Sequence, residues 1–449
     1  MKKLLLSLLS LSLLVLTACG PATPTTTVPT STHPHTAPTT TPGDNAVLAL
    51  EGDTLYSDLQ RSAPADISKA DQNSLEDSNS EFALDLYQSL KEEEGNLFYS
   101  PLSISLALAM TYAGARGETE QQMADTLHFT LEQAKLHQAF NWLDYELAQR
   151  GEDAEGKDDE GFRFNIVNAI WGQLGYEFLV DFLDVLAENY GAGLRGLDFK
   201  NQPEESRITI NDWVSQQTES RIEDLIPQGA IDDLTRLVLT NAIYFNAAWQ
   251  YPFEEENTYD DTFYLMDGSE ITVPMMHQTE SLGYTEGNGY QAVELRYDGD
   301  ELSMVILLPE EGNFEAFESS LDAAMLEEII GNIEVAKVTL SMPKFEFTSE
   351  FKLRETLETM GMVDAFSGSA DFSGITNKES LFISDVIHKA FVSIDEYGTE
   401  AAAATAVIMV GSALFEPASI DINHPFIFLI RDVETGTILF LGRVLNPGA

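Results

Sequence analysis

The chain has 449 residues, of which 74 are acidic and 24 basic, so its formal net charge at pH 7 is −50. This length and a hydrophobic content of 44% allow one large domain, or two of ordinary size, with a substantial core. So large an acidic excess repels nucleic acid, anionic membrane surfaces and anionic polysaccharides, so electrostatic binding to any of them is not expected. An acidic, solvated surface, as in proteins kept soluble at high salt, is favoured instead.

The first eighteen residues are typical of an export signal. They read MKKLLLSLLSLSLLVLTA, in which Lys2 and Lys3 precede an apolar run too short for a comfortable membrane span. Cys19 follows directly, is the only cysteine of the chain, and resembles the lipidated cysteine of a bacterial lipoprotein signal. We therefore predict a signal peptide over residues 1–18 and a lipid anchor at Cys19 on the outer face of the cell membrane. An ordinary cleaved signal is the alternative.

A Thr/Pro-rich segment follows this cysteine. Residues 20–43 read GPATPTTTVPTSTHPHTAPTTTPG, which contains too few apolar side chains to form a core and predicts an extended tether. We interpret His33 and His35 as solvated linker residues, because a metal site needs further ligands. The polar sequence from 44 to about 74 predicts loose structure. Tether and loose segment together span residues 19–75, and the predicted domain spans 76–449.

Helical periodicity begins at the start of this domain. In SNSEFALDLYQSLK, Phe82, Leu86 and Leu90 recur four residues apart behind the candidate caps Ser78–Ser80, which predicts a core helix. The next segment, NLFYSPLSISLALAM, predicts a short strand and then a helix that is apolar all round, ends near Gly114 and is therefore buried.

Strand patterns dominate the second half of the chain. LVLTNAIYF and VAKVTLSMPKFEF are rich in apolar and β-branched residues, and the closing HPFIFLIRDVETGTILFLGRVLNP predicts a strand pair. A hairpin is predicted around an Asp298-Gly299 turn. Helices first and strands later, without regular alternation, favour an α+β domain. The alternating positions of the hairpin are Val293, Leu295 and Tyr297 on one strand and Leu302, Met304 and Ile306 on the other.

Known catalytic motifs are missing from the sequence. There is no G-x-S-x-G, H-E-x-x-H, G-x-x-x-x-G-K-[ST] or G-x-G-x-x-G pattern. Asp385 and His388 could belong to a Ser-His-Asp site, but their odd spacing in a strand-like run directs them to opposite faces. The acidic run at 151–161 lacks the spacing of a calcium loop. We predict no enzyme activity, no metal and no cofactor.

A series of segments occurs in an order that resembles a known family. These are NLFYSPLSISLALAM, LTNAIYFNAAWQYPF, VPMMHQ, SMPKFEF, HKAFVSIDEYGTEAAAATAV and HPFIFLIRDVETGTILFLGRVLNP. They resemble the signature segments of the serpins, the protease-inhibitor superfamily, across essentially all of residues 76–449. The resemblance implies an α+β fold with three β-sheets, eight or nine helices and an exposed reactive-centre loop. It also implies a monomer with a metastable native state.

The alanine-rich run IDEYGTEAAAATAV corresponds to the hinge of that loop. In inhibitory serpins the hinge leaves its exposed position and enters the largest sheet as a new strand. Small inward side chains suit this movement, because burying an unpaired charge is costly. The alternative for the run is an ordinary helix capped by Thr399. The resemblance assigns to the hinge Glu396, Gly398, Thr399, Glu400, Ala401, Ala402, Ala403 and Ala404.

Further roles follow from the same resemblance. Trp249, with the ion pair Lys344–Glu396, matches the place where insertion begins. The alternative for Trp249 is an ordinary core aromatic, whereas we interpret the ion pair as positioning the hinge, because partly exposed ion pairs contribute little to stability. A polar cluster that controls opening of the sheet is matched by Ser100, Ser103, Asn241 and His388, or these are simply satisfied core polar groups.

The target follows from the scissile bond, which the family spacing places at Ser412–Ala413, with Leu414–Phe415 as the alternative. Neither bond offers Arg or Lys, so the predicted target is an elastase-, subtilisin- or chymotrypsin-like serine protease rather than a trypsin-like one. No glycosaminoglycan activation is expected, because the early segment 131–150 carries only Lys135 and Arg150 as basic residues besides its histidine. The predicted function is a suicide-substrate serine protease inhibitor. The alternative is a non-inhibitory surface binding protein with the serpin fold.

Overall fold

The computed structural model describes residues 47–49, 54–55, 57–64, 66–151, 154, 163–378, 381–399 and 417–449. Several predicted features therefore lie outside the described residues: the signal peptide, Cys19, the tether, the hinge residues Glu400, Ala401, Ala402, Ala403 and Ala404, and the two candidate scissile bonds, Ser412–Ala413 and Leu414–Phe415.

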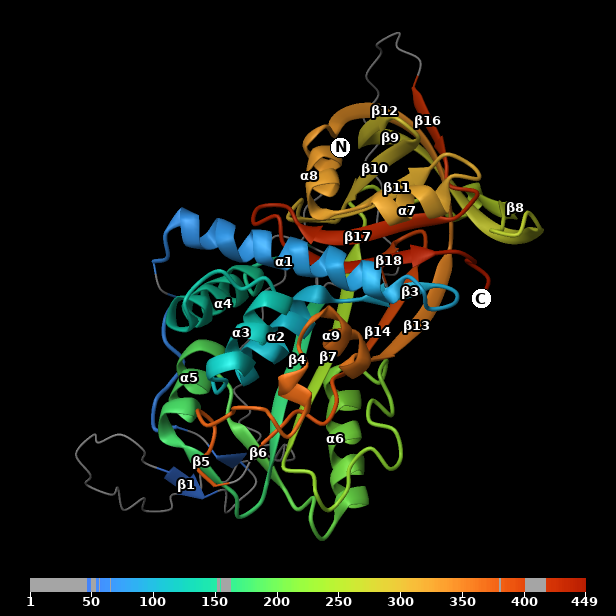
Figure 1. Ribbon diagram of the computed structural model, residues 1–449. Helices are drawn as coiled ribbons and strands as arrows, with labels where there is room; N and C mark the ends of the chain where they lie inside the picture. The colour runs from blue at the N-terminus through green and yellow to red at the C-terminus, as the bar shows by residue number, and fades with distance from the viewer. Residues whose placement is uncertain are drawn as a thin grey trace, which may run out of the picture. The chain divides into compact units, whose positions relative to one another are not determined.

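The described part of the chain contains nine α-helices (Figure 1). The predicted buried helix is α2, in which every residue is buried and which starts with Pro101 at its first position. Ser100 caps it by accepting a hydrogen bond from the Ser103 N–H. The helices are α1 (Lys69–Leu90), α2 (Pro101–Tyr112), α3 (Gly117–Thr126), α4 (Gln133–Leu147), α5 (Val180–Tyr190), α6 (Pro203–Gln217), α7 (Phe314–Ser320), α8 (Ala323–Gly331) and α9 (Arg354–Met360).

Three β-sheets are formed by the described strands. The smallest pairs β1 (Val47–Ala49) with β5 (Glu177–Leu179). The seven-stranded sheet has the order β13 (Phe345–Lys352), β14 (Ile387–Ile394), β15 (Gly398–Thr399), β7 (Leu237–Ala248), β4 (Arg163–Gln173), β6 (Leu194–Leu197) and β2 (Thr54–Leu55). The nine-stranded sheet has the order β16 (Ala418–Asp421), β12 (Glu334–Pro343), β9 (Glu270–Gly287), β10 (Tyr290–Arg296), β11 (Leu302–Pro309), β17 (Phe426–Asp432), β18 (Ile438–Val444) and β3 (Leu97–Tyr99), with β8 (Thr258–Tyr264) paired to β9.

The predicted hairpin around Asp298-Gly299 is confirmed. Strands β10 and β11 pair antiparallel, with Leu295 opposite Met304 and Val293 opposite Ile306. The closing segment forms β17 and β18, which also pair antiparallel. Strand and hairpin patterns were sufficient here because both strands are buried and their register is fixed by the alternation.

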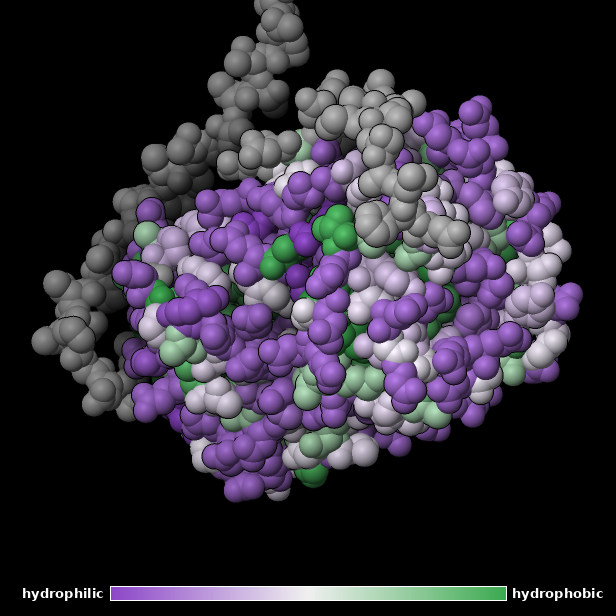
Figure 2. Space-filling view, turned by 90° about the horizontal axis from the view of Figure 1, so that it is seen from above, coloured by the Kyte–Doolittle hydropathy of each residue, from purple (hydrophilic) through white to green (hydrophobic). Residues whose placement is uncertain are grey.

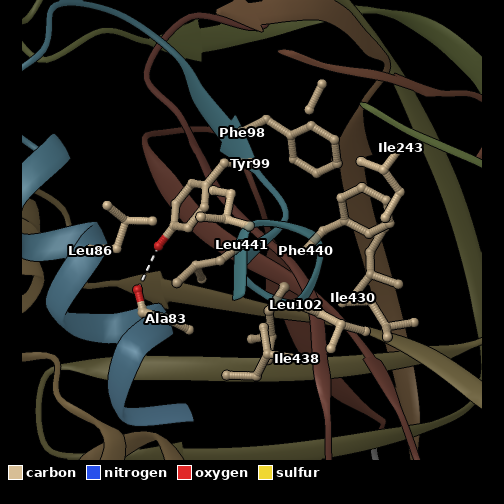
Figure 3. Packing of buried hydrophobic residues seen from close by; sticks show 14 of the residues in the cluster. Ala83, Leu86, Phe98, Tyr99, Leu102, Ile243, Ile430, Ile438, Phe440 and Leu441 are labelled. Carbon is tan, nitrogen blue, oxygen red and sulfur yellow. Dashed lines mark hydrogen bonds between the residues drawn. The ribbon is translucent and has the colours of Figure 1, made fainter. Parts of the chain in front are cut away.

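Apolar side chains fill both faces of the seven-stranded sheet. On one face the rings of Phe98 and Phe440 stack at 4.9 Å, and the buried Tyr99 hydroxyl donates to the Ala83 carbonyl at 2.6 Å (Figure 3). On the other face α6 packs a separate cluster onto the sheet, which joins Ile210 and Val214 of α6 to residues of β4, β7 and β14. The sheet is thus held between two cores.

The prediction of loose structure up to about residue 74 is wrong for much of that segment. Helix α1 already begins at Lys69, with Ser68 as its cap, so the predicted caps Ser78–Ser80 lie inside the helix. Strand β2 adds to the edge of the seven-stranded sheet beside β6. Arg61 donates to Asn141 and pairs with Asp144 at 2.5 Å. These contacts with distant residues order a segment that lacks apolar periodicity.

The surface is largely hydrophilic on the face that Figure 2 shows. Hydrophilic residues cover most of the face seen in Figure 2, with small apolar areas between them. No helix in the described ranges is long and apolar enough to cross a membrane.

Candidate functional site

The chain makes a tight turn where β14 ends. After Ile394 it passes through Asp395, Glu396 and Tyr397 and returns as β15, and the Asp395 N–H donates to the Gly398 carbonyl at 3.0 Å. The Asp395 carboxylate accepts from the N–H groups of Tyr397 at 2.8 Å and Gly398 at 3.3 Å. Burial raises the pKa of Asp395, although these two hydrogen bonds oppose that shift. The aspartate thus closes a hairpin turn at the start of the hinge.

The segment after β7 holds this turn in place. The Trp249 N–H donates to the Tyr397 carbonyl and the Phe253 N–H to the Glu396 carbonyl, both at 2.7 Å. The indole N–H of Trp249 donates to the Asp395 carbonyl at 3.1 Å. Every carbonyl from Asp395 to Tyr397 therefore has a partner, so the turn is fixed to the rim of the sheet.

The first hinge residues already lie in the sheet. Gly398 pairs with Ala248, and Thr399 pairs with Ala247 on β7 and with Ile394 on β14. Gly398 has a φ of +155°, and a Cβ there would collide with the Ala247 carbonyl oxygen and lie 2.8 Å from the Ala248 Cα. Glycine is required by this close approach of two backbones as well as by the dihedral.

An ion pair lies beside the turn. Lys344 Nζ is 2.6 Å from a carboxylate oxygen of Glu396, whose side chain is only 7% exposed. Burial opposes the ionisation of Glu396, but the hydrogen bond from Lys344 and further hydrogen bonds outweigh this penalty and lower its pKa. Glu396 is therefore a buried, paired carboxylate two residues before β15.

Two aromatic side chains line the inner side of the hinge. The rings of Trp249 and Tyr297 stack at 4.7 Å, and the Tyr297 hydroxyl lies 2.7 Å from the hydroxyl of Thr399. Thr399 is 2% exposed and faces inward. The rim thus contains both the predicted Trp249 and a second aromatic residue, Tyr297, that sequence reasoning treated only as a strand position.

Below the hinge, β14 and β7 pair directly over only four positions. These parallel pairs run from Ile387 with Thr240 to Ala390 with Ile243. Higher up, Ile394 and Ala247 both pair with Thr399 of the antiparallel β15. No direct β14–β7 pairing is found between these two levels, although both strands are described there. A chain continuing from Thr399 in the direction of β15 would enter between β14 and β7.

A polar cluster lies where the two strands do pair. His388 Nε2 accepts from the Ser100 N–H at 3.1 Å, and His388 Nδ1 lies 2.5 Å from Asn241 Oδ1, which places the ring proton on Nδ1. Asn241 Nδ2 is 2.6 Å from Ser103 Oγ and 2.7 Å from Asn168 Oδ1. The structure thus brings Ser100, Ser103, Asn241 and His388 together, and it adds Asn168, which sequence reasoning missed.

Burial determines the charge state of this cluster. His388 is fully buried, and burial lowers its pKa to about 3. The imidazole is therefore neutral at pH 7 and links β14 to β7 and α2 through uncharged hydrogen bonds. No hydrogen bond or ion pair joins Asp385 to His388 among the described residues, and the Asp385 carboxylate accepts from the N–H of Val386. The structure therefore does not assemble the Asp385–His388 pair considered from the sequence.

No group of three or more His, Cys, Asp or Glu side chains is arranged to hold a metal ion within the described ranges. Of the three site residues that sequence reasoning missed, only Asp395 has a local sequence pattern that could have indicated it. Asp395 opens an Asp-Glu-Tyr-Gly sequence, which is a turn signature. Asn168 and Tyr297 give no such signal, because they reach the site only through sheet pairing.

The rim of the seven-stranded sheet thus combines a strand that begins inside the sheet, a paired glutamate beside it and a neutral polar cluster below it. The family model described as serpin (serine protease inhibitor) matches residues 77–447. The chain therefore belongs to the serpin family, which confirms the resemblance and the predicted α+β serpin fold. Serpins are protease inhibitors and generally not enzymes.

Relatives and solved structures agree with this assignment. An uncharacterised serpin-like protein of Thermococcus kodakarensis is 44% identical over 82% of this chain and 84% of its own. Human leukocyte elastase inhibitor is 39% identical over 83% of this chain and 99% of its own. The native structure of tengpin, a thermophilic serpin, matches with a TM-score of 0.75 and 29% identity, covering 86% of this chain and 97% of tengpin.

Proposed function

We propose that this protein inhibits a serine protease as a suicide substrate. The observation that carries the proposal is that Thr399 is already paired on both sides, with Ile394 and Ala247, at the entrance between β14 and β7. A loop attached to a residue in this position can extend the sheet by one strand once its far end is released.

In the proposed reaction, the protease serine attacks the carbonyl of the scissile residue. An ester to the protease forms, and the amine of the following residue leaves. The freed loop then enters the sheet behind Thr399 and carries the attached protease with it before water cleaves the ester. The strain stored in the native state drives this movement.

Insertion requires the lower part of the sheet to open. The four β14–β7 pairs must separate, and with them the hydrogen bond between His388 and Asn241. The new strand replaces the lost backbone hydrogen bonds on both sides. Opening the polar cluster therefore costs a moderate free energy, that of its side-chain hydrogen bonds, and does not prevent insertion.

The composition of the hinge supports inhibition over the alternative, a non-inhibitory binding protein. The run after Thr399 contains one charged residue, Glu400, followed by four alanines. None of these side chains resists burial in a sheet except Glu400, which alternation directs outward. We assign the scissile bond to Ser412–Ala413, with Leu414–Phe415 as the alternative.

The target class follows from these residues. Small or apolar side chains at both candidate bonds favour an elastase-, subtilisin- or chymotrypsin-like protease, and the name of the human leukocyte elastase inhibitor is in keeping with this choice. Acidic neighbours engage both basic residues of segment 131–150. Arg150 is 6% exposed and lies 2.7 Å from Asp432, while Lys135 lies 3.2 Å from Asp71. We therefore propose activity without a glycosaminoglycan. We also propose that the protein acts as a monomer, as the serpin resemblance implies.

We further propose that Cys19 is lipidated and holds the protein on the outer face of the membrane. Expression of the full chain and of Cys19→Ser in a bacterial host, followed by membrane fractionation and metabolic labelling with a fatty acid, tests this directly. The label should be found in the membrane fraction of the wild type and be lost in the variant. Labelling that persists in Cys19→Ser would refute the anchor.

The inhibitory proposal is tested by mixing the full chain with elastase, subtilisin and chymotrypsin in high salt. A band that joins inhibitor and protease and survives denaturation is expected, and the mass of the released C-terminal peptide identifies the scissile bond. Clean cleavage by all three enzymes without such a band would make the protein a substrate rather than an inhibitor.

A further inference from the structure

Tyr297 is a buried polar side chain behind the first hinge residue. It is 1% exposed, its ring stacks on Trp249 at 4.7 Å, and the edge of its ring contacts Phe245 at 5.2 Å. These two rings fix the direction of the phenol. Its hydroxyl therefore stays 2.7 Å from the hydroxyl of Thr399 and cannot turn towards solvent.

Each of these two hydroxyls depends on the other. Among the described residues, Thr399 is the hydrogen-bond partner of the Tyr297 hydroxyl, and burial raises the pKa of this hydroxyl and so keeps it neutral. If Thr399 left the sheet, the phenol would keep a buried hydroxyl without a partner. The pair therefore favours the state in which Thr399 is inserted.

The turn before Thr399 does not depend on this pair. Asp395, Glu396 and Tyr397 are held by backbone hydrogen bonds to Trp249 and Phe253. Thr399 is thus the first residue beyond a fixed turn, and its side chain has one specific polar contact inside the sheet. The position of Thr399 can change without loss of the turn.

We propose that Tyr297 is a positioning residue that keeps Thr399 paired between β14 and β7 before cleavage, so that loop insertion starts from a strand already begun. This rests on the proposed inhibitory function. The first residues of a new strand lose backbone entropy before they gain neighbours, so a strand already begun lowers the free-energy cost of starting the insertion. Insertion competes with hydrolysis of the ester, and Tyr297 therefore raises the fraction of protease that is trapped.

The test uses four variants of the full chain. Tyr297→Phe and Thr399→Val each remove one hydroxyl at nearly constant shape, Thr399→Ser keeps the hydroxyl, and the double variant Tyr297→Phe/Thr399→Val leaves no hydroxyl unpaired. Tyr99→Phe is the matched control. It removes another buried hydroxyl, which donates to Ala83 in the same core, at a distance from the hinge.

Three quantities are measured for each variant. Hydrogen exchange with mass spectrometry follows the amides of residues 395–399 in the uncleaved protein. The number of inhibitor molecules consumed per protease inhibited, together with the association rate, follows the trapping reaction. Tyr297→Phe and Thr399→Val should each raise the exchange of the Gly398 and Thr399 amides roughly tenfold, the factor expected for one unsatisfied buried hydroxyl. For both variants, more inhibitor molecules should also be consumed per protease molecule inhibited.

Thr399→Ser and Tyr99→Phe should behave like the wild type in both measurements, and the double variant should be no worse than either single variant. Unchanged exchange and consumption in Tyr297→Phe would overturn the proposal. So would faster association at unchanged consumption, because Tyr297 would then restrain the loop instead of preparing it. If the wild type formed no covalent complex, the proposed function would fail, while the exchange measurement would still decide whether Tyr297 holds the hinge.

Discussion

Acid should lower the free energy of unfolding through protonation of His388, and the size of this loss follows from the lowered pKa of the buried imidazole. The pKa of His388 is lowered from 6.5 to about 3, so between these pH values the unfolded chain binds a proton that the folded chain rejects. Stability therefore falls as pH drops from about 6.5 towards 3. At pH 5 the loss for this one residue is about 2 kcal/mol relative to pH 7.5.

The assay compares urea unfolding of the wild type and His388→Gln at pH 7.5 and pH 5. Glutamine can accept from the Ser100 N–H but does not titrate, so the stability difference between the two proteins should shift by about 2 kcal/mol in favour of the variant at pH 5. The matched control is the substitution of His137, a second buried histidine, whose pKa burial lowers to about 4. His137 contacts Tyr190 and lies away from the β7–β14 pairing.

Local hydrogen exchange separates the two histidines. Substitution of His388, but not of His137, should abolish the acid-induced increase in exchange of Thr240–Ile243 and Ile387–Ala390, because of the two histidines only His388 lies on these paired strands. A stability difference between wild type and His388→Gln that stays constant from pH 7.5 to pH 5 would refute the claim that this histidine is buried in its neutral form.

Three further substitutions test the hinge and the N-terminal segment. Gly398→Ala should remove β15 from the sheet, because the added Cβ collides with the β7 backbone, and faster exchange at Thr399 would report this. Lys344→Met should raise the pKa of Glu396 and lower the unfolding free energy by about 1–3 kcal/mol, measured in urea, since it leaves a buried carboxylate without its cation. Arg61→Ala should lower the free energy of unfolding by about 1 kcal/mol, because its contacts with Asn141 and Asp144 are lost, and the melting temperature should fall accordingly. An unchanged result in any of the three would contradict the corresponding contact.

The sequence was sufficient for the parts of the fold that local patterns determine. The all-apolar run after Ser100 predicted α2, and the alternation around Asp298-Gly299 predicted the β10–β11 hairpin, because burial imposes a period on each element. The alternative of a helix capped by Thr399 is not tested, because the alanines after it lie outside the described residues, and Thr399 itself pairs with β14 and β7. Local helix propensity could not indicate that β14 and β7 lie on either side of Thr399.

Contacts between distant residues were not accessible in this way. Strand β2 and Arg61 lie in a polar segment without periodicity and are ordered by α4 and by β6. Tyr297 looked like one more alternating strand residue, although it meets Thr399 across 102 positions of the chain. The cluster of Ser100, Ser103, Asn241 and His388 was found only through the family resemblance, since nothing in its spacing predicts that β7, β14 and α2 meet.

The claim that the seven-stranded sheet accepts the loop is tested most directly by heating the protein before and after its loop is cut. The full chain is cleaved with a protease it does not trap, the cut within residues 400–416 is verified by mass spectrometry, and both forms are melted under the same salt and pH. The cleaved form should unfold at a much higher temperature than the intact form, because its loop fills the space between β14 and β7. Equal melting temperatures would mean that the loop stays outside the sheet, and the inhibitory mechanism would then be wrong.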